Sequence, residues 1–176
     1  ARMWASTRKH AQRAGHLELV VFGGSVSAGC GRTGQRCEPG HSWARLLMDV
    51  LDVSLGAHAV PAHRISPRVD IVAKGAILPE YFTTCTGGYL EGRRRNQVII
   101  VEFGPSLMVT GSHDCRLGLE PLILALRAAA PWSPIVYVHW KVLKGSAARL
   151  DACERSLLDL FALRHVDAIL AHSLTA

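Results

Sequence analysis

A serine surrounded by glycines stands directly after an apolar, β-forming stretch near the start of the chain. The stretch covers residues 17–22, and Gly23-Gly24-Ser25-Val26-Ser27-Ala28-Gly29 follows it. Glycines let the backbone turn sharply and let its N–H groups approach a substrate closely. A serine in such a turn can present its hydroxyl to a carbonyl carbon and its own N–H to the carbonyl oxygen. Ser25 is therefore a candidate nucleophile, and a plain turn between a strand and a helix is the alternative.

The same loop contains glycines spaced like a dinucleotide-binding fingerprint. Gly29, Gly31 and Gly34 match that pattern by letter, but they start too far past the strand and lead into residues 35–40, which do not resemble a helix start. No Gly-Lys-Ser/Thr triplet is present, which excludes a P-loop. We therefore expect no nucleotide site, and no cofactor is implied.

Histidines could supply the base that a serine nucleophile needs. His113, beside Asp114, follows the third predicted strand and is the candidate base, provided that its ring comes within about 2.6–3.2 Å of the Ser25 hydroxyl. A loop histidine in solvent is the alternative. His139 closes the fourth predicted strand and is expected to be a core histidine.

The elements that must position these residues alternate between short β-forming runs and amphipathic helical runs. The predicted strands cover residues 17–22, 69–73, 97–103, 135–140 and 166–170, and the predicted helices cover 42–55, 78–90, 119–129 and 147–163. This order predicts an α/β fold, a flavodoxin-like three-layer α/β/α sandwich around a five-stranded parallel sheet. The four β-branched residues at 98–101 fit a strand that is covered on both faces. Ligands of such folds bind beyond the carboxyl ends of the strands, where Ser25 lies.

Length and composition indicate one folded domain. The 176 residues are 49% hydrophobic with a mean hydropathy of +0.18, which excludes a disordered chain. No apolar run approaches the roughly 20 residues of a membrane-spanning helix. We assign residues 17–176 to the domain and residues 1–16 to a basic lead-in.

The net charge of +6 is concentrated in that lead-in and in Arg93-Arg94-Arg95. No nucleic-acid-reading module and no interleaved aromatic residues accompany these charges. They are expected to be solvated, and a contact with RNA or an acidic partner is the alternative.

Five cysteines without a C-x-x-C spacing argue against a zinc site. Cys30 and Cys37 bracket the Gly-rich loop and could close a disulfide in an oxidising compartment, with reduced thiols as the alternative. The chain begins with Ala1 and has no signal-peptide core, so we expect a processed or excerpted piece that lacks its targeting signal.

Short blocks at three successive strand tips resemble the GDSL/SGNH hydrolase family. Phe22 to Gly29 resembles its F-G-D-S-L-S-x-G block, and is more similar still to a plant and algal branch with G-G-S-V-T-x-G. Val72-Ala73-Lys74-Gly75-Ala76 stands at the N-x-G block, and Val101-Glu102-Phe103-Gly104-Pro105-Ser106-Leu107 stands at the G-x-N-D block. The resemblance runs through most of the chain and implies the SGNH fold and serine ester hydrolysis without a metal or cofactor.

The resemblance also implies a role for each matching residue. Ser25 aligns with the nucleophile and one oxyanion N–H donor, and Gly75 with the second donor. Ser106 aligns with an Asn whose side chain is the third donor, and losing such a donor typically costs about 2.7–4 kcal/mol of transition-state stabilisation. The family's base belongs to a D-x-x-H block beyond the fifth strand, which the five-residue spacing of Asp167 and His172 does not fit. Without a base, a serine hydroxyl is a weak nucleophile.

Two hypotheses follow. The first is a very weak or inactive serine ester hydrolase whose Asp and His lie on a missing C-terminal tail or another chain. The second is a non-catalytic scaffold or binding subunit of a larger assembly, with RNA as a less favoured partner. Either way, we expect apolar surface where the family has a final helix, covered by a partner chain or a continuation of this chain. The resemblance favours the secretory lumen or the extracellular space, with an organelle interior as the alternative.

Overall fold

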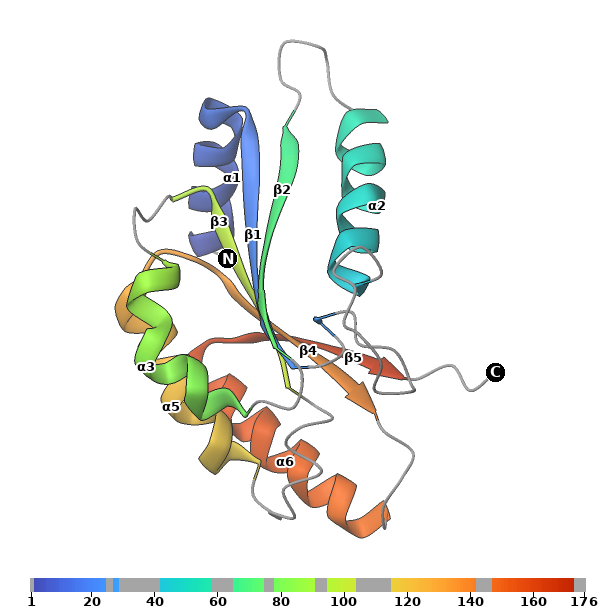
Figure 1. Cartoon of the computed structure of the whole chain (residues 1–176), viewed down its shortest axis with the longest axis vertical. Helices are drawn as coiled ribbons and strands as arrows, with labels where there is room; N and C mark the ends of the chain where they lie inside the picture. Colours follow the sequence, from blue (N-terminus) through green and yellow to red (C-terminus); the bar gives the residue numbers. More distant parts are fainter. Residues whose placement is uncertain are drawn as a thin grey trace.

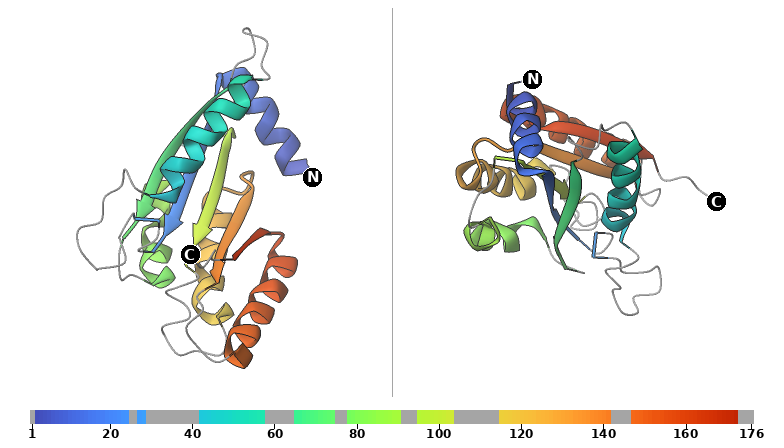
Figure 2. Two further views of the ribbon diagram at one scale, coloured as in Figure 1. Left: turned by 90° about the vertical axis from the view of Figure 1, so that its right-hand side faces the viewer. Right: turned by 90° about the horizontal axis from the view of Figure 1, so that it is seen from above.

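A computed structural model describes residues 2–24, 27–28, 42–57, 65–74, 78–90, 95–103, 115–141 and 147–172. Five strands form one parallel sheet in the order β2-β1-β3-β4-β5 (Figure 1): β1 (His16–Gly23), β2 (Ser66–Ala73), β3 (Gln97–Glu102), β4 (Ile135–Lys141) and β5 (Asp167–His172). The sheet is strongly twisted, so that β4 and β5 cross the direction of β1 and β2 (Figures 1 and 2). The predicted α/β class with a parallel sheet is confirmed.

Helices cover both faces of this sheet. One face carries α2 (Trp43–Ala57), and the other carries α3 (Pro79–Tyr89), α5 (Arg116–Ala129) and α6 (Ala147–Arg164) (Figure 1). Side chains of β1 alternate between the two layers, because successive residues of a strand point to opposite faces. Val20 and Phe22 belong to the larger core below α3, α5 and α6, whereas Leu19 and Val21 pack with Ala44 of α2. Every residue of β3 is buried, as its β-branched run predicted.

The segment expected to be a basic lead-in contains the first helix, α1 (Arg2–Ala14). It lies against β1 and β3, and its buried residues are the small Thr7 and Ala11. The indole Nε1 of Trp4 donates a hydrogen bond of 2.7 Å to Asp167 at the start of β5. The segment is amphipathic, but its buried positions hold these small side chains instead of large apolar ones, so the helix was not predicted from the sequence. The basic side chains of this helix are exposed: Arg2, Arg8, Lys9 and Arg13.

Two elements begin three residues earlier than their sequence patterns predict. β2 includes Pro67 and Arg68, which an edge strand tolerates because one side of its backbone needs no partner. α5 begins at Arg116, whose Nε lies 2.8 Å from Oε2 of Glu120 one turn later. Such an i,i+4 ion pair stabilises a helix that its apolar spacing alone does not reveal.

A disulfide joins Cys115, at the start of α5, to Cys153 of α6, with the Cα atoms 5.0 Å apart. Both cysteines are buried, and Cys85 is an exposed free thiol. Cys30 and Cys37 lie outside the described residues, so their pairing stays a prediction.

The expected open apolar surface is not found on the central strands, since residues 97–102 and 135–139 are buried. Exposed apolar side chains instead form a stripe on the outer face of α2, where Leu46, Val50 and Val53 are 61%, 61% and 71% exposed. A covering partner therefore stays a prediction, with α2 as the surface it would meet. No helix in the described ranges is long and apolar enough to cross a membrane.

Candidate active site

Three neighbouring strands end level with one another at one edge of the sheet. Gly23 at the end of β1 is in register with Ala73 of β2 and with Glu102 of β3. The backbone continues this alignment past the strands, since Lys74 N donates to Gly23 O over 3.3 Å. Gly24 N likewise donates to Glu102 O over 3.1 Å. The three sequence blocks thus start side by side, as parallel topology requires.

The predicted catalytic residues themselves lie outside the described residues: Ser25, Gly75, Ser106 and His113. Their roles and mutual distances stay predictions. The residues directly before the first two, Gly24 and Lys74, are described and stand at the edge formed by β1 and β2.

A buried chain of hydrogen bonds holds the turn after β1. The Ser27 hydroxyl donates to Glu102 Oε2 over 2.9 Å and accepts a hydrogen bond of 3.0 Å from Trp43 Nε1. Ala28 N closes the turn by donating to Gly24 O over 3.0 Å. Ser27 and Glu102 have no exposed surface. Glu102 therefore binds the described residues on both sides of Ser25, through its backbone at Gly24 and its side chain at Ser27.

The carboxyl group of Glu102 is unusual because it is buried at the end of a strand. Burial raises its pKa from 4.5 to about 7, although hydrogen bonds from the Ser27 hydroxyl and from the backbone of Ser27 and Gly24 lower it. Its Oε1 has no hydrogen-bond partner among the described residues. Burial and the charge of Glu102 also raise the pKa of Tyr137 on β4. Among the described residues, the hydroxyl group that donates to Glu102 is that of Ser27, which lies in the turn. The carboxyl group of Glu102 therefore holds the turn in place.

Sequence reasoning missed this support. Glu102 was visible as the single acidic residue in the apolar run of 98–103, and Ser27 as a second serine two residues after Ser25. A single acidic side chain in a strand that is buried on both faces must be hydrogen-bonded or neutral. Such a residue in a sequence therefore indicates a buried polar contact. Nothing in the sequence points to the indole of Trp43 as the partner.

The same packing makes Gly23 intolerant of a side chain. A Cβ at this position would overlap the Cβ and Oγ atoms of Ser27 and lie 3.1 Å from Glu102 O. We expect Gly23→Ala to lower the free energy of unfolding by about 1–3 kcal/mol, the usual cost of overpacking, in urea titrations. Gly87→Ala on α3 is the matched control, because a Cβ there meets no atom within 4 Å, and it should gain up to about 1 kcal/mol. Equal stability of Gly23→Ala and the parent chain would contradict this packing.

His139 is buried, as predicted for the end of β4, with 2% of its surface exposed. Its Nε2 lies 3.6 Å from Oε1 of Glu154 on α6, and its ring stacks on Tyr137 at a centroid distance of 6.0 Å. This environment is that of a paired core histidine.

Comparison with known proteins identifies the fold. No family model and no curated protein sequence matches the chain. Among solved structures, TesA superposes with a TM-score of 0.67 at 15% identity, over 86% of this chain and 76% of TesA. AlinE4, an SGNH-hydrolase family esterase, gives 0.65 at 16% identity over 88% and 75%. The psychrotrophic esterase EstA from Pseudoalteromonas sp. gives 0.65 at 13% identity over 88% and 76%.

Sequence identities this low establish only the fold, so the likeness to the plant and algal branch stays a prediction. The superpositions span nearly the whole chain and agree with the parallel sheet between helical layers. The chain has the fold of the SGNH hydrolases.

Proposed function

We propose that this chain is a serine ester hydrolase-like domain of the SGNH type in which Ser25 is the nucleophile. One observation carries the proposal: buried Glu102 binds Gly24 and Ser27, the described residues that flank the two-residue segment containing Ser25. A turn held at both flanks in this way supplies the kind of support that a positioned nucleophile requires. The turn also follows the carboxyl end of a central strand, where ligands of open parallel sheets bind.

The proposed reaction starts with attack of the Ser25 hydroxyl oxygen on the ester carbonyl carbon, as its proton passes to a base. The N–H groups of Ser25 and Gly75 stabilise the resulting oxyanion. Collapse of this intermediate breaks the ester bond and releases the alcohol, which takes up the proton. Water then hydrolyses the acyl-enzyme and restores the serine hydroxyl.

We infer that the 176 residues catalyse this reaction very weakly or not at all. Ser106 stands in place of the third oxyanion donor, and the residues after β5 contain no D-x-x-H block. In serine hydrolases, loss of the base lowers kcat by on the order of 10⁶.

The test is hydrolysis of p-nitrophenyl acetate by the parent chain and by Ser25→Ala. We expect rates that differ by less than about tenfold, the size of a contribution near 1.4 kcal/mol. Ser54→Ala, which removes an exposed serine of α2, is the control for handling differences. A large turnover that disappears only in Ser25→Ala would show that a base is present, and His113→Ala would then be the next variant.

The second candidate function is a non-catalytic scaffold or binding subunit. The exposed apolar stripe of Leu46, Val50 and Val53 on α2 favours it, because such a stripe fits a protein interface better than solvent. Sedimentation of the purified chain tests whether this stripe holds copies of the chain together, since a well-folded monomer at all concentrations would count against such an assembly. For either function we propose an oxidising compartment, such as the secretory lumen or the extracellular space, which the Cys115–Cys153 bridge supports.

A further inference from the structure

β2 is an edge strand whose outer backbone groups can be identified from two hydrogen bonds. Ser66 N donates to Gly15 O over 3.0 Å, and Lys74 N donates to Gly23 O over 3.3 Å, so even-numbered residues of β2 turn their N–H groups toward β1. Backbone groups alternate along a strand. The N–H and C=O groups of Ile71 and Ala73 therefore point away from the sheet. Pro67 shares this outward set, where its missing N–H has no effect on the pairing with β1.

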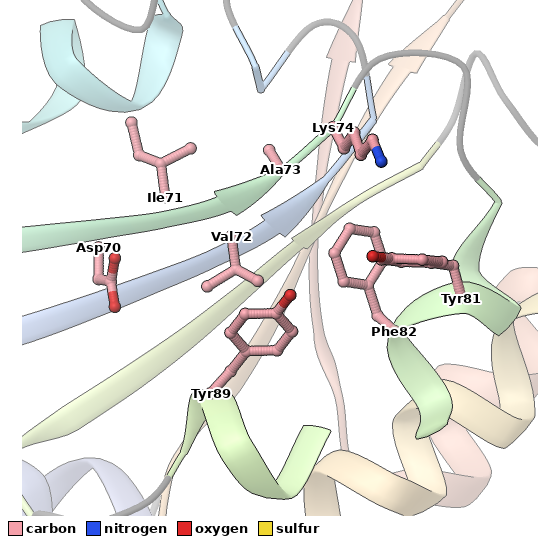
Figure 3. A pocket seen from close by; sticks show the side chains of 8 residues that line it. All are labelled: Asp70, Ile71, Val72, Ala73, Lys74, Tyr81, Phe82 and Tyr89. Atoms are coloured by element: carbon pink, nitrogen blue, oxygen red, sulfur yellow. The ribbon is translucent and has the colours of Figure 1, made fainter. Parts of the chain in front are cut away.

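A pocket of about 270 Å³ lies along this edge (Figure 3). Its lining combines residues 70–74, at the end of β2, with Tyr81, Phe82 and Tyr89 of α3. Because side chains alternate between the faces of a strand, a pocket touched by five consecutive residues also touches the strand's backbone edge. The pocket is thus walled on one side by main chain and on the other by aromatic rings.

The pocket has an apolar centre, with the charged residues Asp70 and Lys74 at its two ends. Val72 and Phe82 are buried at the centre, while Tyr81 and Tyr89 are 46% and 42% exposed. The side chains of Tyr89, Phe82 and Tyr81 stand in a row beside Val72 and Lys74 (Figure 3). Lys74 Nζ lies 5.5 Å from the centroid of the Tyr81 ring.

Asp70 and Lys74 share one face of β2 with Val72, each two residues away from it. A bound strand would therefore meet a negative group, an apolar pocket and a positive group at a spacing of two residues. Side chains on one face of an added strand have this same spacing.

We propose that this edge binds an extended peptide of a partner protein, which adds as a strand beside β2. The peptide's main chain pairs with the outward groups of Ile71 and Ala73, as in other cases of strand addition. One aromatic or large aliphatic side chain enters the pocket, which is larger than the roughly 150 Å³ that accepts a benzene ring. The residues two before and two after it carry a cation opposite Asp70 and an anion opposite Lys74. This surface does not depend on the proposed hydrolase chemistry.

Two synthetic heptapeptides test the proposal. Thr-Lys-Thr-Phe-Thr-Glu-Thr places its charges for parallel addition, and Thr-Glu-Thr-Phe-Thr-Lys-Thr for antiparallel addition. We expect one of them to bind the full 176-residue chain and to slow amide hydrogen exchange at Ile71 and Ala73. N-methylation of phenylalanine should weaken parallel binding at least tenfold, whereas N-methylation of the threonine before it should not. For antiparallel addition the two effects are exchanged, because the other set of N–H groups faces β2.

Variants of the chain check the pocket and the charge pattern. Tyr89→Ala should weaken binding at least tenfold, and Trp132→Ala, which removes an exposed aromatic residue outside the pocket, should leave it unchanged. Asp70→Lys should weaken binding of the preferred peptide. Binding to this variant should be restored by a second peptide in which glutamate replaces the lysine. Where a variant fails to fold, the N-methyl series on the parent chain decides alone.

Four results would overturn the proposal. The first is that neither peptide binds up to millimolar concentration, and the second is that all N-methylated forms bind as tightly as the unmodified peptide. The third is that free p-cresol binds as tightly as the peptide. The fourth is a dimer of the chain that the peptides do not dissociate. The third would show a pocket for a small ring, and the fourth would show a second copy as the occupant.

Discussion

Replacing Cys115 and Cys153 together with alanine is expected to lower the free energy of unfolding by about 4 kcal/mol. The bridge links positions 38 residues apart, and closing a loop of that length restricts the unfolded chain by about this amount in the chain-entropy model. The loss is large because a whole domain is typically stable by only about 5–15 kcal/mol. Urea titration of the oxidised parent and of the double variant measures it directly.

Reduction supplies an independent check. With Cys30 and Cys37 replaced by serine in both chains, so that their predicted pairing plays no part, dithiothreitol should destabilise the parent by a similar amount and leave the double variant unchanged. Cys85→Ala is the matched control, because this exposed thiol has no role in the bridge and its loss should change stability by less than about 0.5 kcal/mol. If reduction leaves the parent's urea midpoint unchanged, the bridge does not form in solution.

The stability of the chain is expected to fall as the pH rises from about 4.5 to about 7, by an amount that Glu102→Gln removes. The pKa of Glu102 is about 7 in the folded chain, against an ordinary value of 4.5. Between these values the folded state keeps a proton that the unfolded state releases, so raising the pH favours unfolding. At about 1.4 kcal/mol per pH unit, the total is about 3 kcal/mol. Glutamine imitates the protonated carboxyl group, so the variant and the parent should be equally stable near pH 4 and differ most above pH 8.

Glu120→Gln is the control of opposite sign. Arg116 and Arg164 donate hydrogen bonds to Glu120 and lower its pKa, so its contribution is present above the ordinary value and is lost as the pH falls. The variant should therefore be less stable than the parent at neutral pH and approach it in acid. A difference between Glu102→Gln and the parent that does not vary from pH 4 to pH 8 would contradict the buried, raised carboxyl group.

The order of the elements could be predicted because the hydrophobic periods of this chain are distinct. The β-branched run before Glu102 needs cover on both faces, and the structure buries all of β3. α1 could not be predicted in the same way, because it packs through Thr7 and Ala11. The segment has the amphipathic spacing of a helix, but its buried positions hold small side chains that fit against β1 and β3, where the other helices bury large apolar ones.

The candidate site was predictable only at the level of strand ends. A glycine-rich turn directly after an apolar run is expected at the carboxyl edge of a parallel sheet, and Gly24, the residue before Ser25, lies at that edge. What holds the turn in place depends on tertiary contacts between distant residues. Ser27 and Glu102 are 75 positions apart, and Trp43 reaches them from a helix on one face of the sheet. Their identities could be noticed in the sequence, but their hydrogen bonds required the fold.

The bond between Trp4 and Asp167 has a consequence for the time course of synthesis. Its partners are 163 positions apart, so α1 leaves the ribosome long before the residue that holds its first turn exists. At roughly 5–20 residues per second, that delay lasts on the order of ten seconds or more. During this interval the helix can dock on β1 and β3 and, once α5 has been made, on Arg127, whose Nη1 lies 3.5 Å from Met3 Sδ. The contact with Asp167 spans most of the chain, and such contacts form late and slowly. The start of the first helix should thus lack its hydrogen bond to β5, and be more accessible to proteases and chaperones, until translation reaches Asp167.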